Sequence, residues 1–439
     1  MKNILIKSFT TILCILMLLS PLTSTSSTIL EKEKQVNSIE VRTTSLNPKI
    51  KGALSMINET MLRNYLIDLV SFGSRVTGSY SNEKAAEYLF QQFEKMNLES
   101  EYHSWSVHND KKIPMLYNSK NVIATQKGTD DSCEEDLIFN AHFDAVKNSP
   151  GANDDGSGTI AVLAAAYVLS KFDFNRTIKY ILFSGEEQGL LGSHEYVRNL
   201  YEKNEKIFVE MNADMIGHTR TAEGGRKYRV YATNDALWII DEMEKINQDY
   251  NINFNISNGV TTLDGGGGSD HVSFVRYGFE TLAYFQAEII VRYWHTTMDL
   301  IEHINFSYLV NTTRLIVGTL AQLADIKDTT HPQIKIASPK RGRLYFQDRI
   351  ICEYEKFETK IIDDFEIYAE VEKGNSPISH VEFYYDGKLS FTDTEAPFHW
   401  RLNKISFTEH IIKVVAYDES GKTANDEMMI FYLNLNRKK

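Results

Sequence analysis

Between residues 59 and 98, apolar side chains recur every three or four positions, which is the spacing of one face of an α-helix. We therefore expect two helices in this stretch. A polar segment with a glycine, residues 74–79, interrupts the pattern and predicts a loop between them. The apolar positions of the two faces are Leu62, Tyr65, Leu66 and Leu69, then Ala85, Leu89, Phe93 and Met96.

After residue 98, short apolar runs alternate with longer helical patterns. The alternation predicts an α/β domain built around a mixed, mostly parallel sheet. We expect strands at 137–140, 178–183, 208–212, 228–232 and 281–285, and helices at 156–170, 190–201, 236–250 and 306–324.

The pattern changes again near residues 328–332. From residue 331 onward, apolar and polar residues alternate in short runs and no helical spacing is found. Asp386-Gly387 is typical of a two-residue hairpin turn between strands. Residues 331–439 are therefore expected to form a small β-sandwich.

The N-terminus has the pattern of a secretory signal peptide. Lys2 and Lys7 precede an apolar run at 9–19, and small polar residues follow it. We assign 1–27 to the signal and 28–55, which is polar and poorly periodic, to a linker or propeptide. The protein is then secreted or associated with the cell surface. The alternative is an uncleaved membrane anchor, although the run is short for a membrane span.

Composition narrows the class of protein. Hydrophobic residues make up 42% of the chain and charged residues 24%, which is typical of a packed globular protein. The net charge of −12 argues against nucleic acid as a partner. Cys133 and Cys352 lie outside the predicted signal, and whether they pair is left open.

Polar residues with metal-binding chemistry follow the predicted strands. His142, Glu186, Glu187 and Asp214 each come just after an apolar run. In open α/β sheets, ligands bind beyond the carboxyl ends of the strands, so these side chains are expected to meet. Glu186 and Glu187 are adjacent carboxylates that repel each other. A nearby cation or a reaction that uses them explains the pair best.

Three further segments add to this set. In His142-Phe143-Asp144 the acid can hold the second nitrogen of a metal-bound imidazole. Two acids, Asp154 and Asp155, open a predicted helix, where one can cap the helix and the other can face a cation. His295 is followed by Asp299. Imidazole and carboxylate without thiolate suit zinc best, and the set is large enough for two metals and a carboxylate base.

The motifs also occur in the order found in a known family. They are His142-Phe143-Asp144, Gly-Ala-Asn-Asp-Asp-Gly-Ser-Gly at 151–158, Gly-Glu-Glu-Gln-Gly-Leu-Leu-Gly-Ser at 185–193, Asp-Met-Ile-Gly at 214–217 and His-Thr-Thr-Met-Asp at 295–299. The chain resembles the secreted co-catalytic zinc aminopeptidases of the MH peptidase clan, which includes bacterial leucyl aminopeptidases and glutamate carboxypeptidase-like enzymes. The resemblance implies a three-layer α/β/α zinc exopeptidase domain over residues 56–328.

The resemblance also implies a role for each matching residue. It implies two Zn²⁺ per chain, bridged by Asp154. The first is held with His142 and Asp214, and the second with Glu187 and His295. Glu186 matches the general base, and Asp144 matches the acid that supports His142. Asp270, Tyr293 and Trp294 match positions near the substrate.

One position departs from the family pattern. Many relatives have Tyr before the last histidine, where this chain has Trp294. Glutaminyl cyclases, which resemble the family in fold, also have Trp there, but they use one zinc and lack the continuous Glu-Glu segment. The resemblance therefore favours a peptidase, most simply an aminopeptidase that hydrolyses N-terminal peptide bonds of peptides or proteins.

Three alternatives stay open on the sequence. One is a glutaminyl cyclase-like acyltransferase, and another is a carboxypeptidase or dipeptidase of the same clan. The third is a non-catalytic, zinc-stabilised adhesion module, because residues 331–439 resemble bacterial immunoglobulin-like domains. The substrate side-chain preference and the oligomeric state are not predicted.

Overall fold

The computed structural model describes residues 46–109, 115–262, 268–288, 292–326, 332–353 and 359–435. The predicted signal peptide and most of the predicted linker fall outside these residues, as does most of the predicted boundary at 328–332. The chain from Leu46 onward forms one compact unit.

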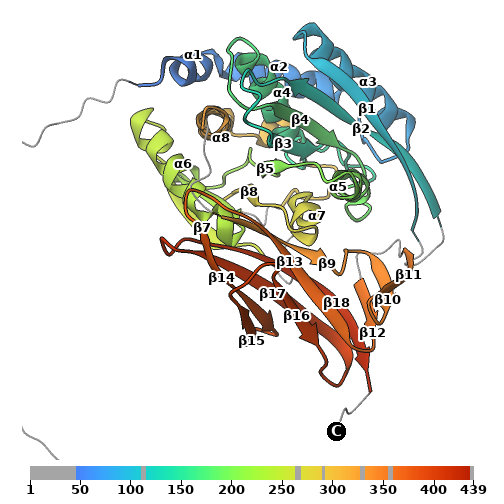
Figure 1. The fold of residues 1–439 in the computed structure, drawn as a ribbon. Helices are drawn as coiled ribbons and strands as arrows, with labels where there is room; N and C mark the ends of the chain where they lie inside the picture. The colour runs from blue at the N-terminus through green and yellow to red at the C-terminus, as the bar shows by residue number, and fades with distance from the viewer. Residues whose placement is uncertain are drawn as a thin grey trace, which may run out of the picture. The chain divides into compact units, whose positions relative to one another are not determined.

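An eight-stranded sheet runs through the first part of this unit in the order β1-β2-β4-β3-β5-β8-β6-β7 (Figure 1). Its centre is parallel, because β3 pairs in parallel with β4 and β5, and β5 with β8. The pairs β1–β2, β2–β4 and β6–β8 are antiparallel. The sheet is thus mixed, as predicted. Its strands are β1 Glu99–Asn109, β2 Met115–Gln126, β3 Asp136–His142, β4 Ile178–Phe183, β5 Ile207–Ala213, β6 Lys227–Ala232, β7 Asn255–Val260 and β8 Thr281–Gln286.

Helices cover both faces of the sheet. Alternate residues of β3 point to opposite sides, so Leu137 and Phe139 join one core while Ile138 joins the other. Helices α4 and α8 pack in the first core and α5 and α7 in the second, which confirms the predicted three-layer arrangement. The helices are α1 Pro48–Met56, α2 Glu59–Val70, α3 Tyr80–Lys95, α4 Gly156–Leu169, α5 Leu191–Glu202, α6 Leu237–Asp249, α7 His271–Arg276 and α8 Phe306–Ala324, with 3-10 turns η1 Gly224–Arg226, η2 Asn234–Ala236 and η3 Ile301–His303.

Five elements of this domain differ from the sequence prediction. Strands β1, β2 and β7 and helix α7 were not predicted. Helix α1 lies in the segment expected to be a linker, yet its Ile50, Ala53 and Leu54 are buried in the main core. β1 escaped prediction because it is an edge strand with mostly polar residues, and Trp105 is a rare buried side chain on it.

The C-terminal part is all β within its described residues, as predicted. A seven-stranded sheet, β11-β10-β12-β18-β17-β14-β15, and a three-stranded sheet, β16-β13-β9, contribute side chains to one core. Asp386 and Gly387 both have positive φ and connect β14 to β15, so the predicted hairpin turn is confirmed. The strands are β9 Gln333–Ser338, β10 Arg343–Phe346, β11 Arg349–Glu353, β12 Thr359–Ile362, β13 Phe365–Glu372, β14 Ile378–Tyr385, β15 Lys388–Asp393, β16 His399–Leu402, β17 Ser406–Asp418 and β18 Thr423–Asn434.

The structure bears on two questions that the sequence left open, the pairing of the cysteines and the presence of a membrane span. Cys133 is buried, Cys352 is exposed, and neither forms a disulfide. Among the described residues, no helix combines the length and the apolar character that a bilayer crossing requires.

Candidate active site

The predicted site residues meet at the carboxyl edge of the parallel strands. His142 is the last residue of β3, Asp214 directly follows β5, and Glu186 comes three residues after β4 ends. Asp154 lies in the loop before α4, and His295 lies in the connection between β8 and α8. Parallel strands place all their carboxyl ends on one edge of the sheet, which is why residues so far apart in sequence converge.

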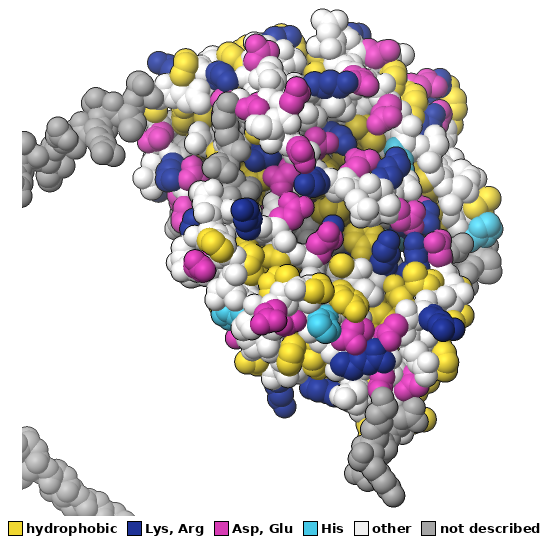
Figure 2. All heavy atoms as spheres, in the orientation of Figure 1, with side chains coloured by type: hydrophobic (Ala, Val, Ile, Leu, Met, Phe, Trp, Pro, Cys, Tyr) yellow, Lys and Arg dark blue, Asp and Glu magenta, His cyan; other side chains and the backbone are white. Residues whose placement is uncertain are grey.

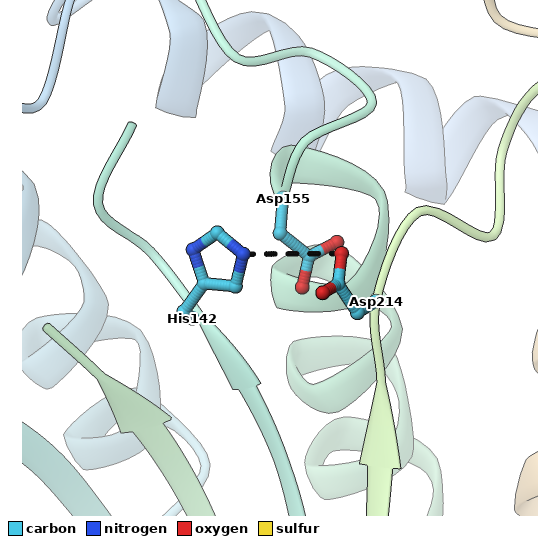
Figure 3. A group of neighbouring side chains, drawn as sticks. All are labelled: His142, Asp155 and Asp214. Atoms are coloured by element: carbon cyan, nitrogen blue, oxygen red, sulfur yellow. Dashed lines mark ion pairs between the residues drawn. The ribbon is translucent and has the colours of Figure 1, made fainter. Parts of the chain in front are cut away.

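His142, Asp155 and Asp214 form the first group of possible ligands (Figure 3). Each offers one ligand atom, and these atoms lie within 4.8 Å of one another. The Nε2 of His142 is 3.8 Å from Oδ1 of Asp214. His142 Nε2, Asp155 Oδ2 and Asp214 Oδ1 are buried and have no hydrogen-bond partner among the described residues. Buried polar atoms rarely stay unpaired, so these atoms fit a bound cation.

Asp154, Glu187 and His295 form the second group. The Nε2 of His295 is 3.1 Å from Oδ2 of Asp154 and 3.2 Å from Oε2 of Glu187. The other oxygen of Asp154, Oδ1, is 3.3 Å from Nε2 of His142. Asp154 therefore lies between the two histidines and offers one carboxylate oxygen to each.

The adjacent acids Asp154 and Asp155 have different surroundings. Asp155 caps helix α4, because its Oδ1 accepts hydrogen bonds from the amides of Gly158 and Met215 at 2.9 and 3.1 Å. Asp154 faces the histidines instead. One acid thus caps the helix while the other faces the site, as the motif predicted, although Asp155 also keeps one oxygen toward the first group.

The carboxylates of Asp154, Glu186 and Glu187 have shifted pKa values. Burial would raise the pKa of Asp154, but the imidazoles of His142 and His295 outweigh it and lower that pKa. Burial, with the charge of Asp154, raises the pKa of Glu187 to about 8. The pKa of Glu186 is likewise raised well above its usual value, mainly by burial. Carboxylates that resist ionisation here would ionise readily beside a cation.

Asp144 holds the glutamate pair and His142 together. Its two carboxylate oxygens accept hydrogen bonds from the backbone amides of Glu186 and Glu187, each at 3.3 Å, and one lies 3.5 Å from Nδ1 of His142. Thr77 also donates to it at 3.0 Å. Asp144 therefore lies beside His142, whose Nδ1 is 3.3 Å from its backbone oxygen, and it links the loop after β3 to the loop after β4.

The three residues expected near the substrate are placed differently from one another. The ring of Trp294 is 48% exposed and lies 4.1 Å from the ring of His295, between centroids. The ring of Tyr293 stacks on His303 at 3.7 Å. Asp270 is fully buried, and its charge contributes to the raised pKa of Glu186. Only Trp294 of the three is well exposed beside the histidine.

Sequence reasoning missed the residues that support these loops. The segment 74–79 was predicted only as a loop, yet Arg75 and Thr77 make contacts directly behind the site. Asp299 was noted only for its spacing from His295. Its carboxylate accepts the amides of Asn153 and Asp154 at 2.9 and 3.0 Å. These roles depend on backbone contacts that residue type and spacing do not encode.

Comparisons with known proteins agree with this geometry. Residues 121–320 match the model of Peptidase family M28. Aminopeptidase YwaD of Bacillus subtilis is 32% identical over 216 residues, and Aminopeptidase Y of Saccharomyces cerevisiae is 30% identical over 220 residues. These alignments cover 46% and 47% of this chain, and they span only 44% and 39% of the two relatives.

Solved structures share the fold of the first domain. The zinc aminopeptidase BSAP from Bacillus subtilis superposes with a TM-score of 0.53 at 20% identity, covering 61% of this chain and 96% of that one. A glutaminyl cyclase from Porphyromonas gingivalis superposes with a TM-score of 0.51 at 18% identity, covering 61% and 99%. The fold alone therefore does not separate the two activities. The match over residues 121–320 and the shared fold therefore make this part of the chain similar to peptidase family M28.

Proposed function

We propose that this protein is a secreted, zinc-dependent aminopeptidase that hydrolyses N-terminal peptide bonds. The observation that carries the proposal is the position of Asp154 between His142 and His295. Each histidine has a further carboxylate beside it, from Asp214 or Glu187. Two sets of nitrogen and oxygen donors that share one carboxylate suit a pair of zinc ions.

The proposed ligands divide between two metals. His142 and Asp214 would hold the first, Glu187 and His295 the second, and Asp154 would bridge them. When bound, the zinc pair supplies Lewis-acid activation of water and positive charge beside the substrate carbonyl. Asp155 keeps a buried, unpartnered oxygen near the first set, but its other oxygen is committed to the cap of α4.

Glu186 is proposed as the general base. Its Oε2 lies 4.0 Å from Nε2 of His142, and its side chain keeps some solvent exposure. It is also the carboxylate of the glutamate pair that is not beside His295. Glu186 would take a proton from the attacking water and pass it to the leaving amine. The buried acids around it would favour a substrate with a free, positively charged α-ammonium group.

Two parts of the proposal concern the rest of the chain. Residues 1–27 are proposed to direct secretion. The C-terminal region is proposed to be an immunoglobulin-like domain, which its two-sheet core supports, and neither group of possible metal ligands among the described residues lies in it.

The test is to read which bond is cleaved. The full chain, loaded with zinc, is incubated with peptides that have free or acetylated N-termini, and the products are weighed by mass spectrometry. We expect stepwise loss of N-terminal residues from free peptides only, abolished by a chelator. Loss of C-terminal residues, or loss of ammonia from N-terminal glutamine without cleavage, would overturn the proposal.

A further inference from the structure

Arg75 is a fully buried arginine directly behind the proposed metal site. Within the described residues, its three hydrogen bonds all end on backbone carbonyls. Nε donates to Phe143 at 2.6 Å, Nη1 to Pro150 at 2.6 Å and Nη2 to Gly151 at 3.0 Å. One side chain thus holds two distant points of the single connection between β3 and α4, residues 143–155.

This connection runs between the ligands at the centre of the site. Phe143 directly follows His142, and Pro150 and Gly151 begin the turn that leads to Asp154. The distance between His142 and Asp154 therefore depends on how Arg75 holds the two parts of the connection. Because a guanidinium presents its donors in a rigid plane, it fixes the three carbonyls relative to one another.

Gly151 shows how closely this contact is fitted. It has a φ of +61°, and a Cβ added to it would lie 2.7 Å from the carbonyl oxygen of Asp154 and 2.8 Å from both Cβ of Ala145 and Nη2 of Arg75. The guanidinium occupies the space that a side chain would need. A residue other than glycine would strain the turn and also push the guanidinium away.

The charge of Arg75 also suits this place. Burial lowers its pKa to about 10, while the acids Asp299, Asp144, Asp155 and Asp154 act in the opposite direction. It therefore remains positively charged near neutral pH.

Asp299 extends the connection to the second histidine. Its carboxylate accepts hydrogen bonds from the amides of Asn153 and Asp154. Its backbone carbonyl oxygen accepts a further hydrogen bond from the amide of Ala152, at 3.2 Å. The loop of Asp154 is thus held by Arg75 through its carbonyls and by Asp299 through its amides. Asp299 belongs to the same connection as His295.

We propose that Arg75 is a positioning residue for the metal centre, which sets the geometry of His142 and Asp154 by holding the carbonyls of Phe143, Pro150 and Gly151. The inference rests on the proposed function, since it assumes that these residues bind metal. A purely structural role would stabilise the fold and leave metal affinity unchanged.

The test compares two buried arginines. Arg75→Lys keeps the charge but cannot reach three carbonyls with one planar group. Arg176→Lys is the matched control, because Arg176 is 2% exposed and donates to the carbonyls of Glu135 and Ile326 at the opposite end of β4. For each variant, zinc affinity is measured by competition with a chelator, the visible spectrum of the cobalt-substituted protein is recorded, and thermal stability is followed.

We expect Arg75→Lys to bind zinc at least about 10-fold more weakly and to change the cobalt spectrum, as outer-sphere partners of metal ligands do. Arg176→Lys should lose stability and keep wild-type zinc affinity. Wild-type affinity and spectrum in Arg75→Lys would overturn the inference. So would an equal loss of affinity in both variants.

A second pair of variants covers the case in which Arg75→Lys does not fold. Gly151→Ala removes no charge or ligand, and its added Cβ crowds the guanidinium, Ala145 and the carbonyl oxygen of Asp154. Gly73→Ala is its control, because Gly73 also has a positive φ, of +75°, but an added Cβ meets nothing within 4 Å. Weaker zinc binding in Gly151→Ala alone supports a role for the packing of this turn between Arg75 and Asp154, and unchanged binding in both variants contradicts the inference. A wild-type chain that binds no zinc would overturn the proposed function as well.

Discussion

Glu186 and Glu187 are adjacent carboxylates whose environments separate them. Their backbone amides both donate to Asp144, while Glu187 points at His295 and Glu186 lies nearer to His142. Each carboxylate therefore lies beside a different imidazole, which reduces the repulsion between the two neighbouring acids. In the proposed function, this separation would let Glu187 bind metal while Glu186 acts as the base.

His271, at the start of α7, gives a prediction about pH and stability. Its side chain is buried, and burial lowers its pKa to about 4. Between that value and the usual 6.5, the unfolded chain binds the proton and the folded chain does not. Stability therefore falls as pH drops from 6.5 to 4, by about 3 kcal/mol from this group.

We expect His271→Gln to lack this part of the pH dependence. Urea unfolding of the metal-free protein at pH 7 and pH 4, for wild type and variant, measures it. Other groups titrate equally in both proteins, so the difference between them isolates His271. Parallel changes in the two proteins would show that His271 does not contribute.

At the level of helices and strands, the site depends on close backbone packing where α4 begins. A Cβ on Gly158 would lie 2.1 Å from the carbonyl oxygen of Ala213, the last residue of β5, and 2.4 Å from Oδ2 of Asp155. Glycine at this position lets the start of the helix approach the strand end that carries Asp214. The metal-facing loops are therefore held by the secondary structure beneath them.

Gly158→Ala should consequently destabilise the protein by about 1–3 kcal/mol, the usual cost of overpacking. It should also weaken metal binding, because Asp155 and Asp214 must move apart. Gly225→Ala is the control, since its added Cβ makes only an ordinary contact with Thr219 at 3.5 Å. Denaturant unfolding of both variants gives the comparison, and equal stability would contradict the packing argument.

Many of the helices and strands could be predicted from the amino-acid sequence. Strand β4 and helix α8 have the predicted bounds, because long apolar runs leave little choice of secondary structure. The convergence of His142, Glu186 and Asp214 followed from parallel strand ends. Strand β1 was not predictable, since its residues are mostly polar and its place is set by pairing with β2. The contacts of Arg75 were hidden for a similar reason, because they go to backbone atoms.

At the scale of the whole molecule, acidic side chains are distributed in two ways, over the surface and within the proposed active site. On the face shown in Figure 2, acidic and basic side chains are interspersed. The proposed active site, in contrast, gathers several buried acids around two histidines. Two zinc ions would offset that concentration of charge, so metal binding and folding are expected to be coupled.

Removal of the metal should therefore lower the melting temperature. A ligand at 100 times its dissociation constant adds about 2.7 kcal/mol, which for a protein of this size corresponds to several degrees. Calorimetry before and after dialysis against a chelator measures the change, and added zinc should reverse it. Identical melting curves in both states would argue against a metal centre in the folded protein.

Glu187 is proposed to bind metal, and its neighbour Glu186 is proposed to accept the proton of the attacking water. The most direct measurement is zinc content per chain, together with turnover of an aminoacyl anilide, for wild type, Glu186→Gln and Glu187→Gln. We predict two zinc ions in wild type, two in Glu186→Gln with turnover reduced by about 100-fold or more, and fewer than two in Glu187→Gln. Near wild-type turnover in Glu186→Gln, or full zinc content in Glu187→Gln, would contradict the account.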